Sequence, residues 1–132
     1  MEALIADRFD LRLSVPSDAT ALALVRHAVG GIAAALGLGP AAVADVRLAL
    51  TEVCSTAIRR GSAMSPLEIT ADLRDDALRV VVRDRAPQPA SGAGDALPLP
   101  LVAAITETVE LRRARGGGTE VTMTFALPRA QA

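Results

Sequence analysis

Two patterns of hydrophobic and polar residues divide this chain of 132 residues into strands and helices. Residues 9–15 read FDLRLSV, and their alternation of apolar and polar positions predicts an amphipathic strand. Four later segments have strand patterns, and Asp75 and Asp76 separate two of them as a tight turn would. The sequence therefore predicts five strands, over residues 9–15, 67–74, 77–84, 108–113 and 119–127.

Apolar residues at helical spacing follow the first strand and recur later in the chain. Ser17 or Asp18 can cap the first helix, and Pro40 suits the first turn of the second. Gly61 follows the second helix as a C-terminal cap would. The sequence therefore predicts three helices, over residues 19–36, 40–60 and 97–106.

The second helix is the most informative segment because it has two stripes. The apolar stripe consists of Val46, Ala49, Leu50, Val53, Cys54, Ala57 and Ile58. The opposite stripe is polar but not uniformly charged, and consists of Asp45, Leu48, Glu52, Ser55, Thr56 and Arg59. The first stripe predicts packing against a core, and the second indicates either a solvated surface or the lining of a site.

Helices and strands are segregated along the chain rather than alternating. This order predicts an α+β fold, a two-layer sandwich with a mixed or antiparallel sheet covered on one face by helices. The length favours a single domain over residues 1–132. Residues 85–96 are rich in Pro, Gly and Ala and predict a long lid-like loop, and residues 128–132 predict a flexible tail.

The composition narrows the classes of function. A net charge of −1 and only two aromatic residues give no support for nucleic-acid binding. No apolar stretch reaches eighteen residues, so we expect no contact with a membrane. The single cysteine, Cys54, cannot form an internal disulfide, which fits a cytoplasmic protein. The chain has no lysine, which excludes a P-loop lysine and a Schiff-base lysine.

Three side chains are candidates for chemistry. Glu52 is either a solvent-facing carboxylate or a general base that faces a cleft. Thr56 follows one turn later, where a hydroxyl is more often on the surface or bonded back to the helix. Asp84 ends an apolar strand, where it either stabilises a turn or accepts a hydrogen bond from a ligand amine.

Three other features have simpler interpretations. Residues 116–118 are glycines between two strands, which favours a hairpin connection over a phosphate-binding loop. Cys54 lies on the apolar stripe and is predicted to be buried and inert. His27, the single histidine, is predicted to lie on a helix surface.

Four segments resemble a known family: AVADVRLALTEVCSTAIRRG, VVVRDRAP, LPLVAAITETVELRR and GGGTEVTMTF. They are similar to the first conserved helix, the nucleotide-box strand, the helix and strand after the lid, and the final Gly-Thr box of the GHKL (histidine kinase-like ATPase) superfamily. The chain resembles most closely the small anti-sigma factors of the RsbW and SpoIIAB type, which are serine-protein kinases. The resemblance covers nearly the whole chain and implies a Bergerat-type sandwich.

The resemblance implies roles for individual residues. Glu52 corresponds to the family's general base, and Thr56 stands where the family has the asparagine that holds Mg²⁺. Asp84 corresponds to the aspartate that binds the adenine amino group, and Gly118 and Thr119 to the Gly-Thr box that supports the adenine site. The implied cofactors are therefore ATP and Mg²⁺.

The phosphate side departs from the family pattern. Ala86 replaces a glycine, and Arg85 is the one phosphate partner at the start of the lid. Asp95 adds a negative charge where the family approaches the next helix with glycines. Phosphoryl transfer needs metal, positioning and charge stabilisation together. We therefore expect a degenerate site with weak or absent kinase activity.

The resemblance implies a cytoplasmic homodimer that sequesters an alternative sigma factor and is countered by a STAS-type anti-anti-sigma protein. Two alternatives stay open. One is an active ATP-dependent kinase that phosphorylates a serine of that antagonist. The other is a non-catalytic interaction domain for another signalling partner.

Overall fold

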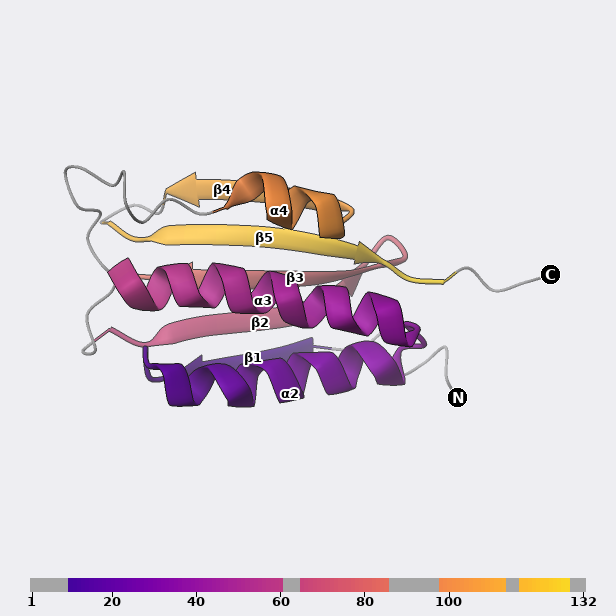
Figure 1. Cartoon of the computed structure of the whole chain (residues 1–132), viewed down its shortest axis with the longest axis horizontal. Coiled ribbons are helices and arrows are strands. Elements are labelled where there is room, and N and C mark those ends of the chain that lie inside the picture. The colour runs from indigo at the N-terminus through magenta and orange to yellow at the C-terminus, as the bar shows by residue number, and fades with distance from the viewer. Residues whose placement is uncertain (1–9, 61–64, 86–97, 114–116, 129–132) are drawn as a thin grey trace.

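The computed structural model describes residues 10–60, 65–85, 98–113 and 117–128. These residues form three helices and five strands (Figure 1). The helices are α2 (Ala19–Ala35), α3 (Pro40–Arg60) and α4 (Leu99–Ile105). The strands are β1 (Asp10–Val15), β2 (Leu67–Arg74), β3 (Ala77–Asp84), β4 (Thr108–Arg113) and β5 (Thr119–Ala126).

The predicted order of elements is confirmed, and their ends differ from the predicted ones by two residues at most. The largest difference is at α4, which begins two residues later than its apolar pattern does. Phe9, most of the predicted lid-like loop (residues 86–97) and residues 129–132 of the predicted tail lie outside the described residues.

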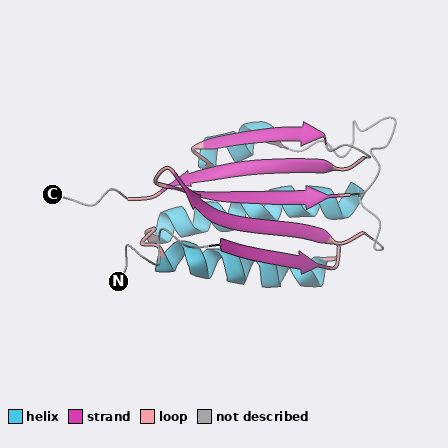
Figure 2. Cartoon of the chain, turned by 180° about the vertical axis from the view of Figure 1, so that it is seen from behind, coloured by secondary structure: helices cyan, strands magenta, loops and turns pink. Residues whose placement is uncertain are grey.

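The five strands form one sheet in the order β1-β2-β3-β5-β4, and every neighbouring pair is antiparallel. All three helices cover one face of this sheet, and the other face is open (Figures 1 and 2). The α+β two-layer sandwich is therefore confirmed, with an antiparallel sheet. Because β3 is the central strand, its last residue, Asp84, is flanked by β2 and β5.

Local sequence signals explain where the elements begin and end. The Asp18 side chain accepts a hydrogen bond of 3.0 Å from the backbone N–H of Ala21, so Asp18 caps α2 as predicted. Asp75 and Asp76 both have positive φ, 50° and 63°, which is the backbone of a two-residue hairpin turn. Among the described residues, no helix is long and apolar enough to cross a membrane.

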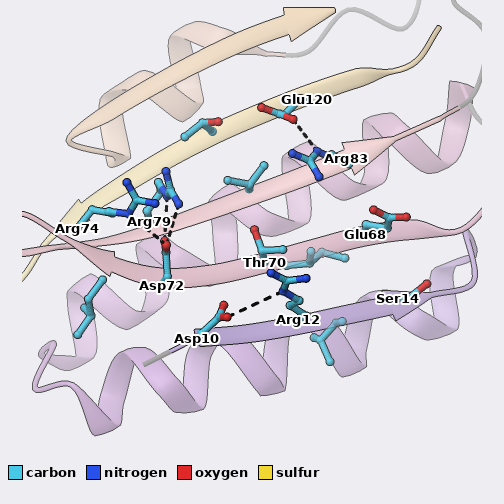
Figure 3. A pocket seen from close by; sticks show the side chains of 15 residues that line it. Asp10, Arg12, Ser14, Glu68, Thr70, Asp72, Arg74, Arg79, Arg83 and Glu120 are labelled. Atoms are coloured by element: carbon cyan, nitrogen blue, oxygen red, sulfur yellow. Dashed lines mark hydrogen bonds and ion pairs between the residues drawn. The ribbon is translucent and has the colours of Figure 1, made fainter. Parts of the chain in front are cut away.

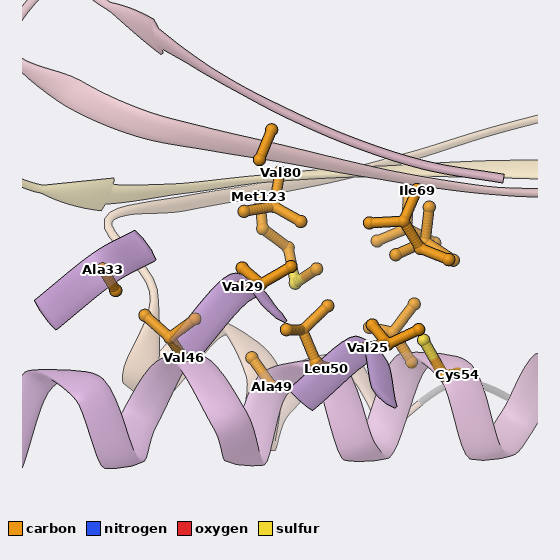
Figure 4. Close-up of a cluster of buried hydrophobic side chains, with 14 of the residues drawn as sticks. Val25, Val29, Ala33, Val46, Ala49, Leu50, Cys54, Ile69, Val80 and Met123 are labelled. Carbon is orange, nitrogen blue, oxygen red and sulfur yellow. The ribbon is translucent and has the colours of Figure 1, made fainter. Parts of the chain in front are cut away.

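The core lies between the sheet and the helices (Figure 4). Alternate residues of β2, β3 and β5 point into it, as their burial patterns show. The apolar stripe of α3 is buried as predicted, except that Ile58 is only partly buried. Burial raises the pKa of the Cys54 thiol to about 12, because the charged thiolate is disfavoured in an apolar surrounding. The predicted inert, buried cysteine is thus consistent with the structure.

The open face of the sheet is polar and forms a broad hollow of about 880 Å³ (Figure 3). Arg79 donates two hydrogen bonds, of 2.9 and 2.7 Å, to the Asp72 carboxylate, and these bonds raise the pKa of Arg79. Arg83 and Glu120 form a second close ion pair, at 2.6 Å. The cations and carboxylates of this face therefore largely neutralise one another.

Candidate functional site

The helix-covered face of the central strands is apolar except at one end, where Asp84 and Thr119 lie. Asp84 is the last residue of β3 and is 5% exposed, and Thr119 is the first residue of β5 and is 3% exposed. Their Cα atoms are direct partners in the antiparallel ladder, so the two side chains share one face. A buried carboxylate beside a hydroxyl offers the acceptors and the donor that a polar ring such as adenine needs. Asp84 is therefore part of the sheet ladder rather than of a turn, and its binding of a ligand stays a prediction.

Gly118 holds the start of β5 against the end of β3. A Cβ atom here would collide with the carbonyl oxygen of Asp84 and would lie 2.8 Å from the Cα of Arg85. The φ angle of +93° also disfavours any other residue. Gly118 therefore fixes Thr119 opposite Asp84. It lies in the connection between β4 and β5, where the run of glycines predicted a hairpin connection. Gly116 lies outside the described residues.

Arg113, the last residue of β4, is a cation that the sequence reasoning missed. It is the direct partner of Thr119 in the ladder, so Arg113, Thr119 and Asp84 form one row across three strands. Paired residues of an antiparallel sheet share a face, so Arg113 lies on the helix-covered side, at the sheet edge. The alternation of TVELRR could have placed Arg113 with Val109, but it could not say which strand lies next to β4.

The polar stripe of α3 is only partly as predicted. Glu52 is half-buried, as either of its two interpretations allows. Thr56, however, is fully buried, so its predicted place on the polar stripe is wrong. Its hydroxyl donates to the carbonyl oxygen of Glu52 at 2.9 Å and accepts from Arg59 Nη2 at 3.2 Å. The hydroxyl can be buried because the preceding turn of the same helix satisfies its hydrogen bond.

The start of the predicted lid points a cation toward the open face. Arg85 Nη2 lies 3.1 Å from the carboxylate of Glu68, which lines the hollow on that face. The Arg85 side chain would have to leave Glu68 before it could bind a phosphate on the helix side. Ala86 and Asp95 lie outside the described residues.

These residues fit the two ends of a nucleotide unequally. In the row of Arg113, Thr119 and Asp84, the last two side chains are buried and Arg113 is exposed at the sheet edge. Binding of an adenine base there stays a prediction. The hydroxyl of Thr56 makes two hydrogen bonds within α3, and the one that it accepts comes from the Arg59 guanidinium, a cation that disfavours Mg²⁺ at the same oxygen. Among the described residues, no group of three or more His, Cys, Asp or Glu side chains is placed to hold a metal ion.

A solved crystal structure has the same fold as this chain. The chain superposes with a TM-score of 0.75 on the crystal structure of the RsbU and RsbW domains of Rv1364c from Mycobacterium tuberculosis, at 23% sequence identity. The match covers 93% of this chain and 34% of that chain, so this chain spans about a third of the length of that protein. At this identity the likeness shows the fold alone.

Comparison with curated protein sequences found no significant match. The model of the histidine kinase-like ATPase domain matches residues 15–125, which include all three helices, β2, β3 and β4, the last residue of β1, and β5 except its last residue. The chain therefore belongs to the histidine kinase-like ATPase domain family.

Proposed function

We propose that this protein is an anti-sigma regulatory factor of the RsbW type, acting in the cytoplasm as a homodimer. It binds and sequesters an alternative sigma factor, and a STAS-type anti-anti-sigma protein releases that factor by competing for it. The likeness of the fold to a structure that contains an RsbW domain supports this choice of partners. Sequestration is a binding event and needs no chemical step.

One observation supports the proposal: the residues predicted for the base end lie together and are buried, whereas the residue at the family's metal position is engaged within its own helix. Asp84, Thr119 and Gly118 form a buried, tightly spaced group at the ends of β3 and β5. Thr56, at the family's metal position, uses its hydroxyl within α3. We therefore infer that ATP docks through its adenine at Asp84, with little contribution from Mg²⁺.

Thermal unfolding with ATP, in Mg²⁺ and in EDTA, tests the nucleotide part of the proposal. A ligand at a hundredfold its dissociation constant adds about 2.7 kcal/mol to the free energy of unfolding. We expect a shift that is similar in Mg²⁺ and EDTA and is lost in Asp84→Asn. Asp72→Asn makes the same change on the open face and is expected to keep the shift. A shift that requires Mg²⁺ would contradict the altered metal position.

Co-expression with each alternative sigma factor of the source organism tests the partner. We expect one stable complex, which the matching STAS-type protein dissociates in a dose-dependent manner. Failure to form a complex with any sigma factor would reject the sequestration proposal and would leave the nucleotide result unaffected.

The active-kinase alternative rests on Glu52, whose half-buried carboxylate lies on α3 where the family has its general base. Labelled ATP incubated with the STAS-type antagonist separates the two functions. Label transfer above that of a Glu52→Ala variant would establish the kinase, and we expect none. If neither the sigma factor nor the antagonist binds, the third alternative applies, a non-catalytic interaction domain for another signalling partner.

A further inference from the structure

The arginines of the two layers differ in how their charges are compensated. On or next to the sheet, six arginines lie within 4.0 Å of a carboxylate. On the helix layer, Arg26 of α2 and Arg47 of α3 form no ion pair with any residue that the structure describes. Arg26 and Arg47 are therefore two exposed cations of the helix layer that no described carboxylate pairs with.

Arg26 and Arg47 meet at one hollow between α2 and α3, two neighbouring helices in Figure 1. The hollow has a volume of about 140 Å³, and its lining residues are Ala23, Arg26, His27 and Arg47. None of them is acidic, and His27 adds an N–H donor to the two guanidinium groups. The acidic residue closest in sequence, Asp45, lines a different hollow together with Ile105 of α4 and Glu107.

Gly30 sets the position of the Arg47 side chain. A Cβ atom at Gly30 would lie 2.5 Å from Arg47 Nε and 3.3 Å from its Cγ and Cζ. The Arg47 side chain therefore lies directly across the backbone of α2 at Gly30, which is buried beneath it. Glycine in the middle of a helix is unfavourable relative to alanine. Here it provides the space that orients a guanidinium beside His27.

We propose that Arg26, His27 and Arg47 form a binding site for a carboxylate group of an acidic protein segment. Two guanidinium groups and an imidazole supply planar donors that match a carboxylate. The volume is suited to one such group and not to a nucleotide. Leu24, which is 56% exposed, lies one helical turn before His27 and offers an apolar contact beside the charge. A segment that combines acidic and apolar side chains therefore fits the site better than a free ion.

This inference does not depend on the proposed function, because it uses neither the nucleotide site nor a sigma factor. The probe is a short fluorescein-labelled peptide of alternating Glu and Leu, with a Gln and Leu peptide as its control. Fluorescence anisotropy with the full chain measures the dissociation constant. We expect the Glu peptide to bind and the Gln peptide not to bind.

Two pairs of variants make the test specific. Arg47→Gln is expected to weaken binding about tenfold, as loss of one charge-assisted contact does. Arg12→Gln removes the same charge from the open face and is expected to leave binding unchanged. Gly30→Ala displaces Arg47 without removing any charge and is expected to weaken binding several-fold. Gly31→Ala is its matched control, because a Cβ at Gly31 meets nothing within 4 Å.

Three results would overturn the proposal. The first is equal binding of the Glu and Gln peptides, and the second is an equal loss in Arg47→Gln and Arg12→Gln. The third is competition by inorganic phosphate with an affinity as high as that of the peptide, which would indicate a free-anion site. Circular dichroism checks that each variant is folded, and the Arg47→Gln result remains decisive if Gly30→Ala does not fold.

Discussion

The two faces of the sheet differ in the side chains that the same strands place on them. On the helix-covered face, alternate residues such as Val80 and Met123 are fully buried and apolar. On the open face, the residues between them carry charges that pair with each other, as Arg79 and Asp72 do. Burial of apolar area stabilises a fold by about 25 cal/mol per Å², whereas exposed ion pairs contribute little. The stability of the fold therefore comes from one face.

This difference makes the polar end of the covered face informative. Asp84 and Thr119 are buried where the alternation of their strands calls for apolar residues. Burying a polar group is costly unless hydrogen bonds compensate for it. Residues that break the apolar pattern of the stabilising face are therefore candidates for function.

The largest effect is expected from neighbouring valines on β3. Val80→Ala removes two buried methyl groups from the covered face and should lower the free energy of unfolding by about 2 to 3 kcal/mol. Val81→Ala makes the same change on the open face, where the side chain is half-buried, and should cost less than about 1 kcal/mol. Urea unfolding of both variants measures the difference, and equal losses would refute the division between the faces.

The second largest loss of stability is expected at the polar end of the helix-covered face. Gly118→Ala introduces a Cβ against the Asp84 carbonyl at a positive φ and should lower stability by about 2 kcal/mol. Gly39→Ala is the control, because a Cβ there meets nothing within 4 Å, and it should change stability by less than about 0.5 kcal/mol. If Gly118→Ala is as mild as Gly39→Ala in thermal unfolding, the close approach of β5 to β3 is not required.

Much of this fold could be predicted from local patterns. The bounds of β2 and β3 follow from apolar runs on either side of Asp75 and Asp76, whose short side chains tolerate positive φ. The cap at Asp18 is likewise a local signal. Each of these features depends on residues close together in the sequence, which is why the sequence alone was sufficient.

The arrangement of the site needed contacts that are distant in sequence. The burial of Thr56 could not be predicted because its position fits the edge of either stripe of α3, and only the placement of the helix on the sheet decides. The row from Arg113 to Asp84 required the strand order, in which β5 lies between β3 and β4. The space above Gly30 depends on a side chain of another helix, Arg47.

A smaller loss of stability is expected at alkaline pH, and it comes from a buried thiol on the helix-covered side of the sheet. Burial raises the pKa of the Cys54 thiol from 9.0 to about 12, so the folded state keeps its proton after the unfolded state has lost it. Stability is therefore complete below pH 9 and falls as pH rises toward 12, by about 1 to 2 kcal/mol at pH 10. Urea unfolding at pH 7 and pH 10 measures the loss. The Cys54→Ala variant should not show the part of the loss that comes from the thiol. Equal losses in the variant and the original protein would contradict the assignment of this loss to Cys54.

The smallest effect is expected on the open face, where Asp72 serves two arginines. Arg79 contacts it through two hydrogen bonds and is 31% exposed at its side chain, whereas Arg74 contacts it at 3.4 Å and is 62% exposed. Double-mutant cycles with Asp72→Asn should give a coupling of about 0.5 to 1 kcal/mol for Arg79→Gln and less for Arg74→Gln. Both couplings should fall in high salt, because these charges are accessible to screening ions. A coupling at Arg79 as large as the loss in Val80→Ala would mean that the open face also stabilises the fold, and the contrast between the faces would fail.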